Sequence, residues 1–271
     1  MRKVQAPIDT AQAVVEYIKD STRPAVFHPP LPARRSLYIA WIVLVIGLLT
    51  TAAVSLYGKS AADRIAEQEF IAECSEIQEK IVARLDDHAR ILRSGAALFK
   101  VSDRVTRENW RIFIERQQVQ KVLPGIQGVG FSLLIPRAEL ARHTQGIRQE
   151  GFPAYKVRPE GDREVYSSII YLEPFADRNL RAFGYDMFSE PVRRAAMGRA
   201  RDMDTVALSD KVILVQETGK DVQAGVLMYV PVYRNGMPTE TVEQRRAAIR
   251  GWVYSPYRMN DLLRGILGGR I

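Results

Sequence analysis

The sequence has few of the residues that metal, thiol and activated-nucleophile sites require. Its 271 residues include a single cysteine, Cys74, and three histidines, His28, His88 and His143, which are far apart in the chain. One cysteine excludes an intramolecular disulfide and a paired-thiol motif. The chain also contains no HExxH helix, GxSxG turn, P-loop or GxGxxG turn. We therefore predict no catalytic residue, no metal site, no cofactor and no enzymatic activity. A hydrolase built on two carboxylates is the remaining enzymatic alternative.

Charge is absent from one stretch, residues 36–58, which is almost entirely apolar. About 20 apolar residues in a helix cross the hydrocarbon core of a membrane. A buried core helix, the alternative, rarely runs so long without a polar face. The sequence therefore predicts one transmembrane helix over 36–58.

The charges on the two sides of this stretch differ. The cations Lys19, Arg23, Arg34 and Arg35 precede it, whereas acidic residues outnumber cations in the segment that follows it. Lysine and arginine accumulate on the cytoplasmic side of a span. We expect residues 1–35 to form a cytoplasmic tether, and residues 59–271 to lie on the periplasmic or extracellular side of the inner (plasma) membrane. Because so long a segment precedes the apolar run, we expect an uncleaved anchor instead of a signal peptide.

The net charge of the chain is +8 at pH 7. Such a balance occurs in proteins that bind nucleic acids. Here the basic residues are spread along the whole chain, and no RNP, zinc-finger or helix-turn-helix pattern is present. We predict no nucleic-acid partner and expect arginine-rich faces near the membrane to contact anionic headgroups.

Residues 59–100 contain no proline and are rich in strong helix formers, which predicts one stalk helix. An apolar stripe recurs along it every three or four residues. The stripe consists of Phe70, Cys74, Ile77, Ile81, Leu85, Leu92 and Phe99, with His88 and Gly95 in two of its positions. It packs either on its own domain or on the same helix of a second subunit, and both stay open, so a homodimer through the stalk is expected. We interpret Cys74 and His88 as packed residues, ahead of an intersubunit disulfide and a metal ligand.

After residue 101 the sequence alternates between helical periodicity and short β-rich runs. Helices are predicted at 107–122, 136–149, 192–201 and 257–267. Strands are predicted at 126–135, 154–158, 165–172, 211–216, 225–233 and 249–255. Strands joined by loops and interrupted by helices are typical of an α+β fold whose helices cover the sheet. We assign Gly125, Gly151 and Gly184 to turns that need a positive φ.

Several short blocks follow one another in this region. They are PGIQGVGF (124–131), EGFP (150–153), YLEP (171–174), GYDMFSEP (184–191), RARD (199–202), LVQET (214–218), PVYR (231–234), GWVY (251–254) and LLRGIL (262–267). In these blocks the chain resembles the CHASE domain, the extracellular sensory module of histidine kinases and nucleotide cyclases. The resemblance implies that residues 101–271 form two PAS-like antiparallel-sheet modules, the membrane-distal one holding a ligand. It also implies a second span and an effector, so we expect an incomplete second module and a chain truncated before that span.

The resemblance also bears on the ligand. Plant members of the family bind cytokinins, and an aspartate just after the strand that corresponds to 169–171 holds the adenine. This sequence has Leu172, Glu173 and Pro174 there, so we expect a different small molecule, compact and polar or amphipathic. A second polar position of the family, a hydroxyl after a leucine, is matched by Ser209.

Other candidate ligand contacts lie on or beside the strands expected at 165–172, 211–216 and 225–233, because pockets combine apolar walls with a few polar groups. The candidates are Tyr171, Glu173, Ser209, Lys211, Leu227 and Tyr229. Each has a structural alternative in the sheet core or at a turn. Asp186 and Arg201 join the set, either as ligand contacts or as an ion pair with each other.

These observations predict a membrane-anchored, extracytoplasmic ligand-sensing domain of a signal-transduction receptor, of the histidine kinase or cyclase type. Its expected partners are a small-molecule ligand, the membrane and a second copy of the chain. The alternative is an anchored protein that binds or presents a ligand without signalling.

The orientation of the span can be tested with a reporter fusion. Alkaline phosphatase needs disulfides that form only outside the cytoplasm, so a fusion after residue 150 is expected to be active. A well-expressed but inactive fusion would reverse the predicted topology.

Overall fold

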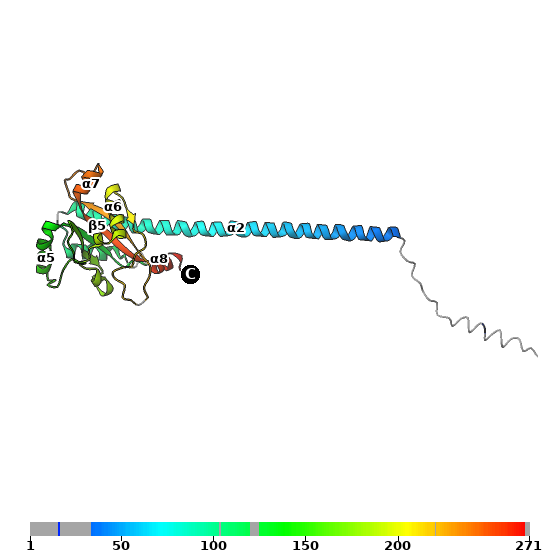
Figure 1. Cartoon of the computed structure of the whole chain (residues 1–271), viewed down its shortest axis with the longest axis horizontal. Coiled ribbons are helices and arrows are strands. Elements are labelled where there is room, and N and C mark those ends of the chain that lie inside the picture. Colours follow the sequence, from blue (N-terminus) through cyan, green and yellow to red (C-terminus); the bar gives the residue numbers. More distant parts are fainter. Residues whose placement is uncertain (1–15, 17–33, 103, 120–124, 220, 269–271) are drawn as a thin grey trace, which may run out of the picture. The chain divides into compact units, whose positions relative to one another are not determined.

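The computed structural model describes residue 16 and residues 34–102, 104–119, 125–219 and 221–268 (Figure 1). Nearly all of the predicted cytoplasmic tether, including the proline-rich part, lies outside these residues. The chain divides into two compact units, residues 1–69 and 70–271, which are described separately.

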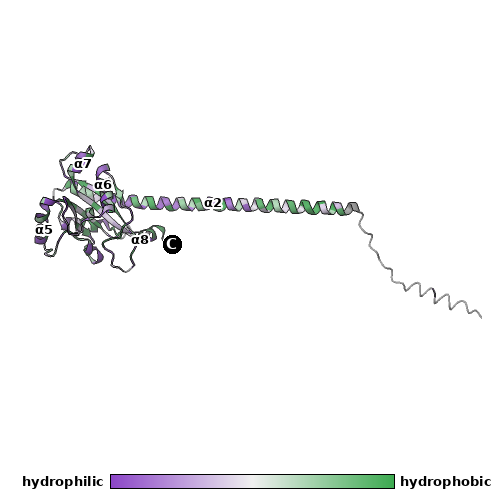
Figure 2. Ribbon diagram, viewed as in Figure 1, coloured by the Kyte–Doolittle hydropathy of each residue, from purple (hydrophilic) through white to green (hydrophobic). Residues whose placement is uncertain are grey.

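Apart from residue 16, the described residues of the first unit all belong to one helix, α2 (Arg34–Val101). This helix continues into the second unit and ends there. Every residue from 37 to 58 is exposed, and Figure 2 shows this part of the helix as mostly hydrophobic. Within the described ranges, α2 is the one helix long and apolar enough to cross a membrane. The prediction of a single long helix over the stalk residues is confirmed.

The second unit is built on one antiparallel sheet of five strands in the order β2-β1-β5-β4-β3. The strands are β1 (Val129–Pro136), β2 (Val165–Glu173), β3 (Ala207–Leu208), β4 (Gly225–Tyr233) and β5 (Ile249–Arg258). At the centre of the sheet, Tyr254 of β5 faces Gly130 of β1 on one side and Tyr229 of β4 on the other. The α+β class is confirmed. The part of the chain that the structure describes holds a single sheet, so the predicted second module is not confirmed.

The predicted helices are present, with small changes in their bounds. They are α3 (Arg107–Gln117), η1 (Arg137–Glu139) leading into α5 (Leu140–Gln149), α6 (Pro191–Met203) and α8 (Met259–Leu267). α3 begins at a capping box between Thr106 and Asn109 and ends at Gln117, because Gln118 adopts a left-handed conformation, φ 48°. Further short helices, η2 (Asp177–Ala182), η3 (Met187–Ser189) and α7 (Val242–Ala248), were not predicted.

Two predicted strands are wrong. At 154–158 only an isolated bridge between Arg158 and Tyr185 forms, and at 211–216 only one between Val212 and Gly225. At 211–216 the chain turns soon after the bridge, because the N–H of Glu217 bonds to the carbonyl of Leu214. The strand pairing therefore does not extend beyond the bridge. The last helix begins at Met259, two residues later than predicted, because residues 257 and 258 still pair with β4.

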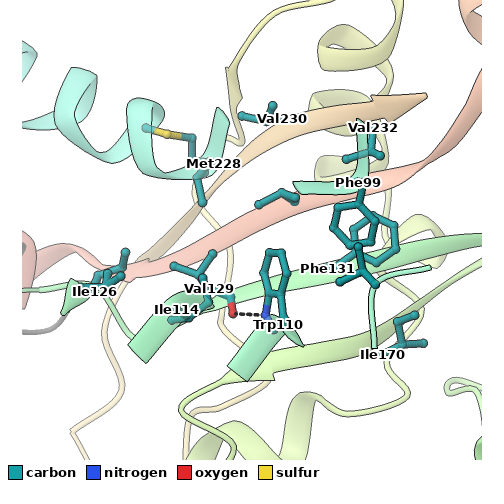
Figure 3. Close-up of a cluster of buried hydrophobic side chains, with 14 of the residues drawn as sticks. Phe99, Trp110, Ile114, Ile126, Val129, Phe131, Ile170, Met228, Val230 and Val232 are labelled. Carbon is teal, nitrogen blue, oxygen red and sulfur yellow. Dashed lines mark hydrogen bonds between the residues drawn. The ribbon is translucent and has the colours of Figure 1, made fainter. Parts of the chain in front are cut away.

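Both faces of the sheet are buried, and successive residues of a strand contribute to opposite faces. One face, which we call the stalk-side face, is covered by the last turns of α2 and by α3 (Figure 3). Its core includes Leu92, Phe99, Trp110, Val129, Phe131, Met228, Val230, Val253 and Tyr257. The opposite face, the α6-side face, packs on α6. Its core includes Ile169, Leu172, Met187, Ala196, Met197, Leu227, Tyr229, Trp252 and Tyr254.

The apolar stripe of α2 therefore has two parts. Leu92 and Phe99 are buried against the sheet, which confirms packing of the stalk on its own domain at this end. Phe70 and Ile77, nearer the apolar run, are 66% and 40% exposed. Pairing with a second subunit through this part stays a prediction.

The tight centre of the sheet gives a test of packing. A Cβ at Gly251 would meet the carbonyl oxygen of Ser132 and lie 2.8 Å from the ring of Phe131, so Gly251→Ala is expected to cost about 1–3 kcal/mol of stability. Gly146, inside α5, has open space around it, and Gly146→Ala should stabilise by about 0.5–1 kcal/mol. Thermal unfolding of the detergent-solubilised chain, followed by the fluorescence of buried Trp110 and Trp252, measures both. A Gly251→Ala variant as stable as the parent would contradict this packing.

Candidate functional site

A small, partly enclosed cavity lies on the α6-side face, between the sheet and the segments that cover it. The sheet contributes Ile169, Leu227 and Tyr254 to its wall, and the cover contributes Ala182, Tyr185, Met187, Arg193, Leu214, Val215 and Gln216. Its volume is about 10 Å³, close to that needed for one water molecule. Most of the wall is apolar, with a few converging polar groups, which is the composition of ligand sites.

Two polar groups at this cavity, from Tyr254 and Arg193, are hydrogen-bond donors. The Tyr254 hydroxyl is fully buried and has no hydrogen-bond partner within the described part of the chain. The Arg193 guanidinium, also buried, donates to the Tyr185 hydroxyl at 3.2 Å and to the carbonyl of Ile213 at 2.7 Å. No aspartate or glutamate appears in the described lining.

Burial determines the protonation of the two central tyrosines on this face. It raises the pKa of Tyr254 well above its usual value, and the positive charge of Arg193 opposes this rise only in part. Burial likewise raises the pKa of Tyr229, whose hydroxyl donates to the sulfur of Met187 at 3.6 Å. Tyr254 therefore keeps its proton and has no acceptor for it.

Three of the sequence-predicted residues meet at or beside the cavity. Leu227 is part of its wall. Tyr229 contacts the lining residue Met187, and the buried Ser209 hydroxyl accepts a hydrogen bond from the N–H of Leu227 at 2.9 Å. Lys211 is exposed and is not among the lining residues. The alternative of a core role also holds for Leu227 and Tyr229, since both are buried.

Tyr171 and Glu173 lie elsewhere, each at a different surface depression. The Tyr171 hydroxyl donates to the carbonyl of Val105 at 2.8 Å. The Glu173 carboxylate accepts from the N–H of Phe175 at 3.0 Å, as a residue at a turn before Pro174 would, and burial raises its pKa. The structure does not bring these two residues to the α6-side cavity.

Of the two alternatives for Asp186 and Arg201, the ion pair with each other is wrong. Asp186 is fully buried and accepts from the N–H groups of Ser167, at 2.8 Å, and Phe188, at 3.0 Å, because it caps η3. Its second oxygen lies 3.1 Å from Nε of Arg163. Arg201, near the end of α6, pairs instead with the adjacent Asp202 at 2.6 Å.

The sequence did not identify Tyr185, Arg193, Gln216 and Tyr254 as residues of this cavity. Tyr254 follows Trp252 at the two-residue spacing of one sheet face, which is a usable signal. The sequence gives no such signal for Arg193, because it is one of several cations on α6 and only its burial distinguishes it from the others.

One further cluster connects the cover of the cavity with the end of α2. Arg107, the first residue of α3, lies over the rings of Phe152, Tyr171, Phe175 and Phe183, at 4.5 to 5.9 Å from their centroids. Its guanidinium also donates to the carbonyl of Ile170 at 2.5 Å. Phe175 and Phe183 belong to the same connection, 174–187, as three lining residues of the cavity. A cation held by several aromatic faces is a stabilising arrangement.

His88 packs as the sequence predicted. Its ring is fully buried and stacks on Tyr257 of β5, with centroids 4.9 Å apart and ring planes 4° apart. Burial is the main cause that lowers the pKa of His88 to about 4, and the positive charge of the neighbouring Arg84 lowers it further. The ring is therefore neutral near pH 7 and is a core residue at the contact between α2 and the sheet.

Comparison with protein families gives one match to this chain. A family model described as CHASE domain matches residues 103–270. No curated protein matches the sequence significantly.

The role of Asp186 can be tested by substitution. Asp186→Ala leaves the N–H groups of Ser167 and Phe188 without their acceptor and the Arg163 guanidinium without its ion-pair partner, so a loss of about 3 kcal/mol or more is expected. Asp210→Ala, at an exposed position, should change stability by less than about 0.5 kcal/mol. Thermal unfolding compares the two. If both variants melt like the parent, Asp186 does not hold this connection in place.

Proposed function

The chain belongs to the CHASE-domain family, whose members are extracellular sensory domains of signalling receptors, and on this premise we propose that it is a membrane-anchored ligand sensor. Residues 36–58 cross the membrane once, residues 1–35 are cytoplasmic, and residues 59–271 lie on the periplasmic or extracellular side. The exposed apolar part of α2 and the cations that precede it support this arrangement. The sensor serves a receptor of the histidine kinase or cyclase type, as in two-component systems, and this chain itself has no catalytic role.

The ligand binds at the α6-side cavity of a PAS-like module. One observation carries this assignment: the Tyr254 hydroxyl is fully buried, keeps its proton and has no partner in the described chain. An unmade hydrogen bond in a core is costly, and a ligand oxygen in the cavity would satisfy it.

Binding is transmitted through segments that adjoin both the cavity and the stalk. The connection 174–187 supplies part of the cavity wall and, through Phe175 and Phe183, part of the cluster around Arg107. Arg107 begins α3, shortly after α2 ends at Val101. A ligand shifts such a system only by binding its two states with different affinity. Family membership favours this signalling role over a binding protein without output.

A thermal-shift screen of the detergent-solubilised chain against small metabolites tests this function. A ligand at one hundred times its Kd is expected to raise the melting temperature by about 5 °C or more. Tyr254→Phe should fold normally, because it removes only an unpartnered hydroxyl, and should reduce the shift at the same ligand concentration. Tyr257→Phe is the matched control, since its hydroxyl is equally buried and unpartnered but lies on the stalk-side face. If no metabolite changes the melting temperature, ligand sensing at this site is wrong.

We further propose that the chain forms a parallel homodimer through the exposed part of its stalk. Phe70 and Ile77 are exposed there, and Cys74 lies between them on the same stripe. Mild oxidation of membranes should then yield a disulfide-linked dimer on non-reducing electrophoresis. The Cys74→Ser variant is the control, and a monomeric band in both samples would count against pairing at this position.

A further inference from the structure

We propose that the α6-side cavity recognises the carboxylate group of a small organic acid, with Arg193 and Tyr254 as its donors. This inference rests on the proposed function, because it names the chemical class of the ligand at the same site. Three properties of the cavity carry it: its charge, its unused donors and the way its wall is attached.

The charge of the described lining is positive. Arg193 is its one ionised residue, and its side chain is 5% exposed. The nearest acid, Glu190, caps α6 with both oxygens, which accept from the N–H groups of Val192 and Arg193 at 3.0 and 2.9 Å. Its distance to the Arg193 guanidinium is 3.5 Å, longer than the 2.7–2.9 Å typical of a strong charge-assisted bond. An anion in the cavity would complete the neutralisation of this buried cation, and a cationic ligand would be repelled.

The donors suit an oxygen acceptor. The Tyr254 hydroxyl is protonated and unpartnered, and an arginine has five N–H donors. The interactions of Arg193 described above use only part of that capacity. A carboxylate has two oxygens and can accept from a guanidinium fork and a phenol together. The remaining wall, which includes Ile169, Ala182 and Leu227, is apolar and fits a short hydrocarbon portion.

The attachment of the wall explains how such a ligand enters a cavity of about 10 Å³. Residues 214–216 form one side and belong to no helix or strand. Their neighbours are held by the bond from Arg193 to the carbonyl of Ile213, at 2.7 Å, by the ion pair of Glu217 with Arg258, at 2.8 Å, and by the bond from Arg181 to the carbonyl of Glu217, at 3.1 Å. A carboxylate competes with the Ile213 carbonyl for the same guanidinium and is the stronger acceptor. Binding an acid thereby releases one of these attachments and enlarges the site.

The test compares acids with their uncharged amides on the detergent-solubilised full chain. The probes are acetate, propionate and pyruvate against acetamide, propionamide and pyruvamide, at equal ionic strength set with sodium chloride. We expect at least one acid to raise the melting temperature in a saturable manner, and its amide to have no effect. Tyr254→Phe should weaken the apparent affinity about tenfold or more, and Tyr257→Phe should not.

Substitution of the cation completes the test. Arg193→Lys keeps the charge but loses the fork, and Arg193→Gln loses both, so the acid should bind progressively less well. Arg194→Gln, at an exposed position of the same helix, is the control for any general effect of removing a cation. If Arg193→Gln fails to fold, Tyr254→Phe still decides the question.

The possible results separate this inference from the proposed function. If the amides, or other neutral or cationic metabolites, give a shift that depends on Tyr254, ligand sensing stands and the carboxylate inference is overturned. Equal shifts from all acids in the parent, Tyr254→Phe and Arg193→Gln proteins would show a general salt effect and overturn it as well. If no molecule of any class gives a shift, both proposals fail.

Discussion

The structure depends on burying both faces of one antiparallel sheet. β4 and β5 are apolar along almost their whole length, so each residue needs a cover on the face to which it points. The last turns of α2 and α3 cover one face, and α6 with the connections 174–187 and 209–217 covers the other. Leu92 and Phe99 show that the end of the stalk helix is part of the domain core and not an appendage to it.

This double cover places the cavity and the stalk helix on opposite faces of the same strands. Leu227 and Tyr254 belong to the cavity wall, and their sequence neighbours Met228 and Val253 face the stalk side. Side chains in a packed core sit close together and transmit small displacements. The sheet is therefore a thin, well-packed layer between the proposed ligand and the end of α2.

Some buried polar side chains fix loops, and others make no hydrogen bond in the described chain. Asp186 holds the connection 174–187 through the N–H groups of its neighbours, and Arg258 holds the loop after β3 through Glu217. Such paired groups are the usual form of buried charge. Tyr254, Tyr257 and His88 are buried with polar atoms that bond to nothing in the described chain. Of these, Tyr254 alone borders the cavity on the α6-side face.

The sequence by itself determined the apolar run at 36–58, the long helix after it, the α+β alternation and the family, because each is written in local periodicity or in contiguous blocks. It misjudged 154–158 and 211–216, where β-rich composition favours strands but the backbone turns after a single bridge. Only the tertiary structure decided that Arg193 of α6 and Tyr254 of β5 meet at one cavity, and that Asp186 pairs with Arg163 and not with Arg201. The physical reason is that partner choice for a buried charge or hydroxyl depends on the packing of distant segments, which no local pattern in the chain encodes.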